Sequence, residues 1–149
     1  MLFEIFGLIF SIILGTLGHF LYNLSNMNKI IGFVFAKNES VFEHLKLGIT
    51  PILLWTIIEF LTNNFNNLFF SKFICILIFA FILMILYYGY KFFLKKNILF
   101  LDILIFYISL TLAYFVSINI LIYTSFNIFL NIIGIIGIVG VIFSYIIFN

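Results

Sequence analysis

Two histidines and one short acidic stretch contain most of the side chains that could do chemistry. Residues 38–46 read NESVFEHLK, which puts two glutamates, a histidine and a lysine together in a chain of which only 8% is charged. A second histidine, His19, precedes this stretch. Histidine and carboxylate side chains transfer protons as general acids and bases. The candidate catalytic residues are therefore His44, His19, Glu39 and Glu43.

The same four side chains could hold a divalent metal ion. Two imidazoles with one or two carboxylates suit zinc or non-haem iron, with a position left open for water or substrate. The spacing of His19, His44, Glu39 and Glu43 matches no specific metal signature, and H-E-x-x-H is missing from the sequence. A metal-free site, in which histidine and carboxylate exchange protons or hold a polar headgroup, is at least as compatible with these residues.

A further set of polar residues near these four could bind a ligand. It comprises Asn38, Ser40, Tyr22, Lys46 and Asp102. Some of them also have structural explanations. Ser40 and Glu43 have the spacing of a capping box, in which the serine oxygen accepts from a backbone N–H and the glutamate reaches back to the Ser40 N–H. Lys46 can extend its ammonium group to lipid headgroups, and Asp102 can pair with a lysine of the loop before it.

The composition indicates that these residues belong to an integral membrane protein. The chain is 66% hydrophobic and 21% aromatic, whereas a soluble domain is about half apolar and about a quarter charged. A chain of 149 residues cannot hide that excess in one globular core. The expected surroundings are therefore a lipid bilayer. The net charge of +2, without a basic patch, gives no sign of nucleic-acid binding.

Five apolar stretches are long enough to cross a bilayer, which takes about 20 helical residues. They are residues 2–23, 41–61, 69–93, 98–123 and 126–148. Polar residues interrupt them at 26–40, 62–67 and 92–97, and more weakly near 124–127. The sequence therefore predicts an all-α bundle of about five transmembrane helices, forming one domain over residues 1–149.

The lysines predict the orientation of this bundle, because short cytoplasmic loops collect positive charge. With five crossings, the first and third loops share a side with the C-terminus. Those loops and their borders contain Lys29, Lys37, Lys46, Lys91, Lys95 and Lys96, and the opposite side has only Lys72. We expect a multi-pass protein of the cell membrane with its N-terminus outside and its C-terminus in the cytoplasm.

This topology brings the candidate residues to one depth. His19 lies about four residues before the end of the first span and His44 about four residues into the second, so both lie roughly 6 Å below the same boundary. Asp102 enters the fourth span from that side. Ionisable groups inside a span are costly and are functional candidates by default. Glu4 and Glu59 lie towards the opposite side, too far away to join this layer.

Small residues also mark faces on which helices can approach closely. Gly7, Ser11 and Gly15 recur every four residues in the first span, and glycines recur similarly in the fifth span, at 134, 137 and 140. Besides the lipid bilayer, the expected partners are therefore another membrane protein or a second copy of the chain.

The motif resembles a known family. The run H-x-x-Y at 19–22, followed by NESVFEHLK at 38–46, is similar to small prokaryotic multi-pass membrane proteins of unknown function. Members carry a close N-E-S-x-W-E-H-L-K stretch, often after a proline. Here Phe42 takes the place of the tryptophan, and Ala36 and Lys37 precede the motif. The resemblance leaves both glutamates and the histidine of the motif in place, and it implies no particular chemistry.

Three functions remain open at this point. The first is an enzyme that acts on a lipid or amphiphile at the cytoplasmic boundary, with His44 as base or metal ligand. The second is a transporter or small-solute binder, although polar residues cross the middle of the spans only thinly and the paired broken helices of transporters are missing. The third is a non-catalytic scaffold or partner subunit. The sequence does not decide whether the protein is an enzyme.

Overall fold

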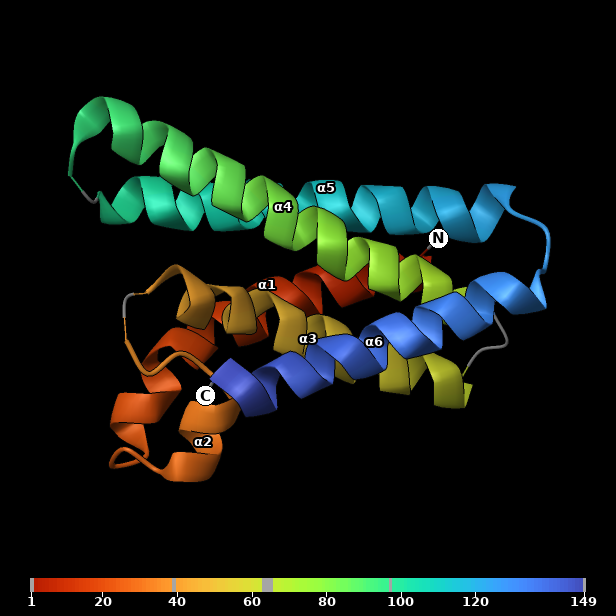
Figure 1. Cartoon of the computed structure of the whole chain (residues 1–149), viewed down its shortest axis with the longest axis horizontal. Helices are drawn as coiled ribbons and strands as arrows, with labels where there is room; N and C mark the ends of the chain where they lie inside the picture. Colours follow the sequence, from red (N-terminus) through yellow and green to blue (C-terminus); the bar gives the residue numbers. More distant parts are fainter. Residues whose placement is uncertain (1, 39, 63–65, 97, 149) are drawn as a thin grey trace.

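A computed structural model describes residues 2–38, 40–62, 66–96 and 98–148 as a bundle of α-helices, with no strand in these ranges (Figure 1). The helices are α1 (Leu2–Leu24), α2 (Lys29–Val34), α3 (Val41–Thr62), α4 (Leu68–Leu94), α5 (Leu99–Tyr123) and α6 (Ile128–Phe148). All except α2 are long and apolar enough to cross a membrane. The five predicted spans are thus confirmed as helices.

Successive long helices run in opposite directions along the bundle (Figure 1). One end carries α2, residues 35–38 and 40–46, the end of α4, the start of α5 and the end of α6; we call it the motif end. The opposite end, here the far end, carries the start of α1, the end of α3, the start of α4 and the turn between α5 and α6. Which end faces the cytoplasm stays a prediction.

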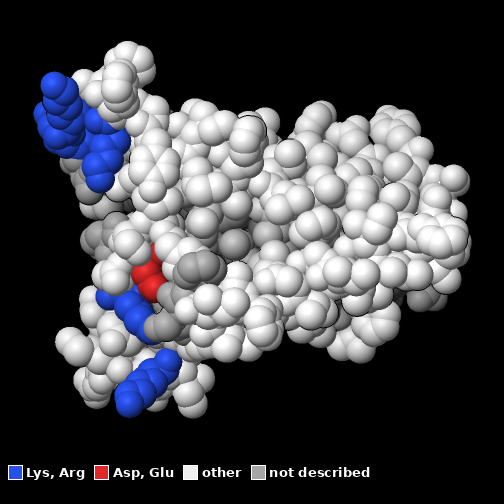
Figure 2. Space-filling view, viewed as in Figure 1, with Lys and Arg blue, Asp and Glu red and all other residues white. Residues whose placement is uncertain are grey.

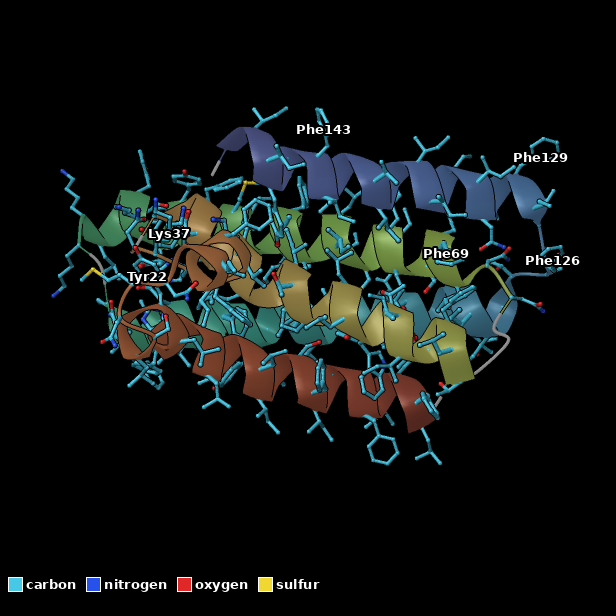
Figure 3. All side chains as sticks on the ribbon, turned by 90° about the horizontal axis from the view of Figure 1, so that it is seen from below. Tyr22, Lys37, Phe69, Phe126, Phe129 and Phe143 are labelled. Carbon is cyan, nitrogen blue, oxygen red and sulfur yellow. The ribbon has the colours of Figure 1, made fainter. Side chains whose placement is uncertain are left out.

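The centre of the bundle is apolar and is organised around α4, which packs against α3, α5 and α6, while α1 packs against α3 and α5. Ile52, Phe79 and Leu110 are fully buried there. The outer surface is apolar too. On α6, Phe129 and Phe143 point away from the bundle (Figure 3) and are 73% and 59% exposed. Apolar side chains on both the inside and the outside are typical of helices in lipid.

Small residues let α1 lie unusually close to α3. A Cβ atom added at Gly15 would lie 2.5 Å from the carbonyl oxygen of Leu47, and one added at Gly7 would lie 2.4 Å from Nε1 of Trp55. The predicted small-residue face of the first span therefore packs within the chain. On α6, Gly134 similarly meets the backbone of α4.

Asn67 fixes the turn between α5 and α6, the break that was weakest in the sequence. It is fully buried and has a left-handed backbone conformation, with φ of 55°. Its side chain donates to Thr124 Oγ1 and to Ser125 O, at 2.9 and 2.8 Å, and accepts from the Asn127 N–H at 2.9 Å. Asn131 Nδ2 adds a longer bond to the same oxygen, at 3.4 Å. These bonds tie the α5–α6 turn and the first residues of α6 to the residue that precedes α4.

Candidate functional site

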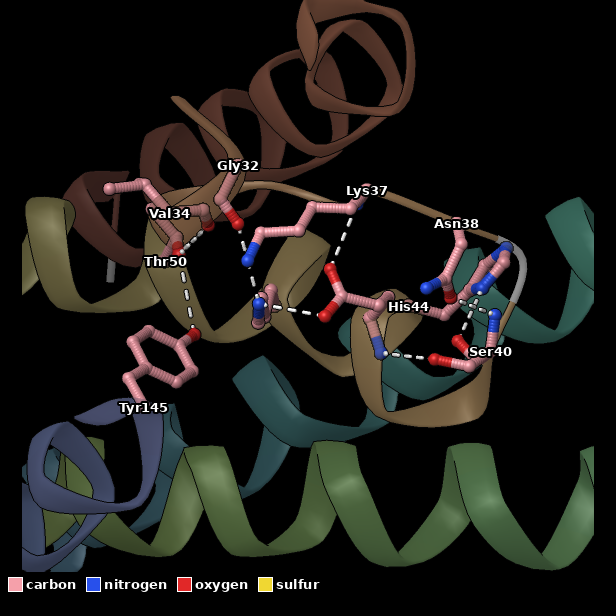
Figure 4. A network of polar contacts seen from close by, with 10 residues as sticks. Gly32, Val34, Lys37, Asn38, Ser40, His44, Thr50 and Tyr145 are labelled. Atoms are coloured by element: carbon pink, nitrogen blue, oxygen red, sulfur yellow. Dashed lines mark hydrogen bonds and ion pairs between the residues drawn. The ribbon is translucent and has the colours of Figure 1, made fainter. Parts of the chain in front are cut away.

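Side chains of α3 hold α2 in place at the motif end (Figure 4). The last carbonyls of a helix lack partners within it. Lys46 Nζ donates to the carbonyl of Gly32 at 3.4 Å, and Thr50 Oγ1 donates to that of Val34 at 2.7 Å. Asn28 caps the start of α2, since its side chain accepts from a backbone N–H of the first turn. The predicted polar loop therefore contains a short helix that the sequence analysis missed.

Glu43 connects this short helix to the start of α3. Its Oε1 accepts from Lys46 Nζ at 2.9 Å, and its Oε2 accepts from the backbone N–H of Lys37 at 2.8 Å. Ser40 Oγ accepts from the Glu43 N–H at 3.3 Å, but the Ser40 N–H donates to Asn38 Oδ1 instead of to Glu43. The expected capping box is thus only half formed, because the glutamate is held by the loop before the helix.

The interpretation of Lys46 as a side chain that reaches lipid headgroups is wrong. Its side chain is fully buried and forms an ion pair with Glu43. The ring of Phe42 lies 5.7 Å from the ammonium group. These contacts give Lys46 and Glu43 structural roles, and their roles in ligand binding or catalysis stay predictions.

The two histidines meet, which their predicted depth alone had left open. The ring centroids of His19 on α1 and His44 on α3 lie 5.5 Å apart, at an interplanar angle of 45°. His44 Nδ1 lies 3.0 Å from the carbonyl oxygen of Ser40. Because a carbonyl oxygen only accepts, Nδ1 carries the proton of the neutral ring, and Nε2 carries the lone pair. His44 therefore presents Nε2 as its basic or metal-binding atom.

The predicted metal set is only partly within the described structure. No group of three or more histidine, cysteine or acidic side chains that could hold a metal occurs among the described residues. Glu39 lies outside them, and Glu43 already pairs with Lys46. Of the described members of the set, His19 and His44 lie ring to ring while Glu43 is paired elsewhere, and metal binding stays a prediction.

Asp102 lies in the first turn of α5, where it accepts a short hydrogen bond from the hydroxyl of Tyr90 on α4. The partner of Asp102 that the structure describes is therefore Tyr90, and not the lysine considered from the sequence. The bond joins the two helices beside their connecting turn. None of the described contacts of Asp102 reaches the histidine pair, so its ligand-binding role stays a prediction.

A cavity of about 430 Å³ opens at the motif end. Its lining residues are Tyr22, Lys29, Phe33, Lys37 and Ile146. Figure 3 shows Tyr22 and Lys37 side by side at this end, and Figure 2 shows that charged side chains on the visible face gather there. Tyr22 was a candidate ligand-binding residue. The others were missed as site residues, because Ile146 and Lys29 lie far apart in sequence and only the fold brings them together.

A second charged cluster lies inside the far end, and the sequence analysis did not recognise it. Lys72 of α4 forms ion pairs with Glu4 of α1 and, at 2.6 Å, with Glu59 of α3. All three side chains are at most 1% exposed. Lys72 had been counted as a charge of the outer side, and the two glutamates as outlying residues. Opposite charges at one depth in three different spans were the signal that could have found this cluster.

One family model matches residues 2–149, and its description is a family of unknown function, DUF6512. The chain belongs to DUF6512. No curated protein and no solved structure matches it. The DUF6512 match covers both the motif end and the far end, and the chain contains five helices that could span a membrane among its described residues.

Proposed function

We propose that this DUF6512 protein binds an acidic phospholipid, or an amphiphile with the same headgroup charge, in the cavity at the motif end. The observation that carries the proposal is the lining of that cavity, which combines two lysines with a tyrosine, a phenylalanine and an isoleucine. A volume of about 430 Å³ is within the range of small-molecule sites.

The lining is divided in the way that an acidic lipid requires. Lys29 and Lys37 provide positive charge for a phosphate group, for which lysine is a common ligand. Phe33 and Ile146 provide apolar contact for the carbon chain next to that phosphate. The cavity therefore fits a molecule that is anionic at one end and apolar at the other.

The position of the cavity supports the same ligand. It lies between the last residues of α1 and α6, where these helices would leave the hydrocarbon and headgroups begin. With the lysine-rich motif end in the cytoplasm, the cavity would face the leaflet that carries anionic lipids. Each lysine near such a surface contributes about 1 kcal/mol of attraction.

The test compares the stabilisation of the purified protein by phosphatidylglycerol and by the zwitterionic phosphatidylcholine. Lys29→Gln/Lys37→Gln removes two charges from the cavity, and Lys95→Gln/Lys96→Gln removes two from the α4–α5 turn at the same end. We expect phosphatidylglycerol to raise the thermal midpoint of the wild type and of the 95/96 variant, and not that of the 29/37 variant. Ligand at 100 times its dissociation constant stabilises by about 2.7 kcal/mol. If both variants lost the rise in thermal midpoint to the same extent, phosphatidylglycerol would be attracted diffusely to the charged surface and would not occupy a site.

A second candidate is a reaction on the same bound amphiphile, with His44 as general base. It is favoured by the His44 Nδ1 contact with Ser40 O, which leaves the lone pair on Nε2. Neither histidine lines the cavity, so binding is the primary proposal. Cellular lipid profiles and bound metal should change in His44→Ala and Glu39→Ala if there is a reaction. Unchanged profiles and metal content in well-folded variants would argue for binding alone.

A further inference from the structure

The charges of the far-end cluster do not balance. Two carboxylates, those of Glu4 and Glu59, face one ammonium group, that of Lys72. All three side chains are closed off from solvent. If every group were ionised, the cluster would carry one negative charge inside the bundle, where an uncompensated charge is costly.

Within the described ranges, no neighbouring side chain provides the missing positive charge. The other titratable groups beside the cluster are the phenol of Tyr114 on α5, whose ring lies 5.2 Å from Lys72 Nζ, and the buried thiol of Cys75 on α4. Both are neutral in their ordinary forms. Ser117 Oγ donates to Glu4 Oε2 at 3.2 Å, and a hydroxyl group adds no charge.

The two carboxylates differ in how their oxygens are used. In Glu4, Oε1 faces Lys72 and Oε2 accepts from Ser117. In Glu59, Oε2 lies 2.6 Å from Lys72 Nζ in an ion pair that lacks hydrogen-bond directionality. Its other oxygen, Oε1, has no hydrogen-bond partner among the described residues, although the side chain is 0% exposed. Glu59 is therefore the carboxyl group whose oxygens are less fully used, and it has room for a proton.

We propose that Glu4, Lys72 and Glu59 form a buried proton-binding site at the far end of the bundle, in which one proton is carried by the carboxyl group of Glu59. With this proton the cluster consists of one carboxylate, one carboxylic acid and one ammonium group, and its net charge is zero. A proton fits better than a metal cation, because the Lys72 ammonium already lies between the carboxylates and would repel a second cation.

The site would join three helices through a single exchangeable ligand. Glu4 belongs to α1, Glu59 to α3 and Lys72 to α4. Loss of the proton would leave an excess negative charge at their contact, so protonation and the packing of the far end would depend on each other.

Infrared spectroscopy of the purified protein in lipid nanodiscs at neutral pH tests the proposal, because a protonated carboxyl group has a C=O stretching band that a carboxylate lacks. We expect the wild type to show this band. Glu59→Gln and Glu4→Gln should each abolish it, since one carboxylate then faces one ammonium group and both stay ionised. Asp102→Asn, which changes a carboxyl group at the other end, should leave it unchanged.

Lys72→Met gives the opposite change. With no ammonium group present, both carboxyls should be protonated, and the band should grow about twofold. If this variant does not fold, the two glutamine variants still decide the matter. A wild type without the band would overturn the proposal, and so would a band that persists in both glutamine variants. A band that appears only when sodium is replaced by a bulky organic cation would overturn it too, by identifying a sodium site.

Discussion

The two ends of the bundle use the same kinds of charged side chain in opposite ways. At the motif end, Glu43 and Lys46 pair within a single turn of α3, and backbone groups of the adjoining loop and helix also bond to them. At the far end, Lys72 meets two glutamates from two other helices. Among the described residues, the first arrangement pairs one carboxylate with one ammonium group and is local, whereas the second is unbalanced and joins distant parts of the chain.

The difference shows how position decides what a charged group can do in a membrane protein. The motif end lies where spans emerge, so charges of lysines such as Lys29 can be balanced by headgroups or salt. The far-end cluster is enclosed by four helices, because Ser117 and Tyr114 of α5 complete it. Its excess charge has to be balanced from within, which points to a proton. The proposed ligand site and the proposed proton site thus use similar residues in different surroundings.

Removing the cation of the unbalanced cluster should have the largest effect on stability. Lys72→Met leaves two buried carboxyl groups that must both take up a proton for the chain to fold, and breaking a buried pair in this way costs about 3–5 kcal/mol. Unfolding in mixed micelles of increasing dodecyl sulfate content measures the loss. The triple variant Glu4→Gln/Lys72→Met/Glu59→Gln, which has no charge to bury, is the matched control and should recover most of it. A triple variant as unstable as the single one would show that packing around Lys72, and not its charge, is what matters.

Removing the cation of the Glu43–Lys46 pair should destabilise the protein less than removing Lys72. In Lys46→Met the carboxylate of Glu43 keeps its bond from the Lys37 N–H, while Oε1 and the carbonyl of Gly32 lose a donor. Unsatisfied buried groups cost about 1–3 kcal/mol, so the free energy of unfolding should fall by about that amount in the same micelle assay. The double variant Glu43→Gln/Lys46→Met has neither charge, so its difference from Lys46→Met measures the cost of the unpaired carboxylate separately from that of the lost hydrogen bonds. If Lys46→Met lowered the free energy of unfolding more than Lys72→Met does, the charged pair of the motif end would matter more for stability than the far-end cluster.

The sequence predicted the spans well because hydropathy depends on residue type alone. It also placed His19 and His44 at one depth, because depth follows from the loops, but it left open whether the two rings face each other. It did not predict which lysines are buried. Lys46 and Lys72 both lie within one or two turns of a helix start, where a lysine that reaches headgroups has the same local sequence as one that turns inward. Only the helices packed against them, which bring Gly32 to one and Glu4 to the other, distinguish the two cases.

The smallest effect is expected for the neutral contacts between the two ends. Ser11 Oγ and Tyr114 OH are 2.8 Å apart across α1 and α5. Such interhelical hydrogen bonds in membrane proteins average about 0.6 kcal/mol. A double-mutant cycle with Ser11→Ala and Tyr114→Phe should give a coupling energy near that value, and the phenylalanine keeps the ring over Lys72. A coupling as large as the loss in Lys72→Met would contradict the view that unbalanced charge, rather than polar contact in general, sets the far end apart.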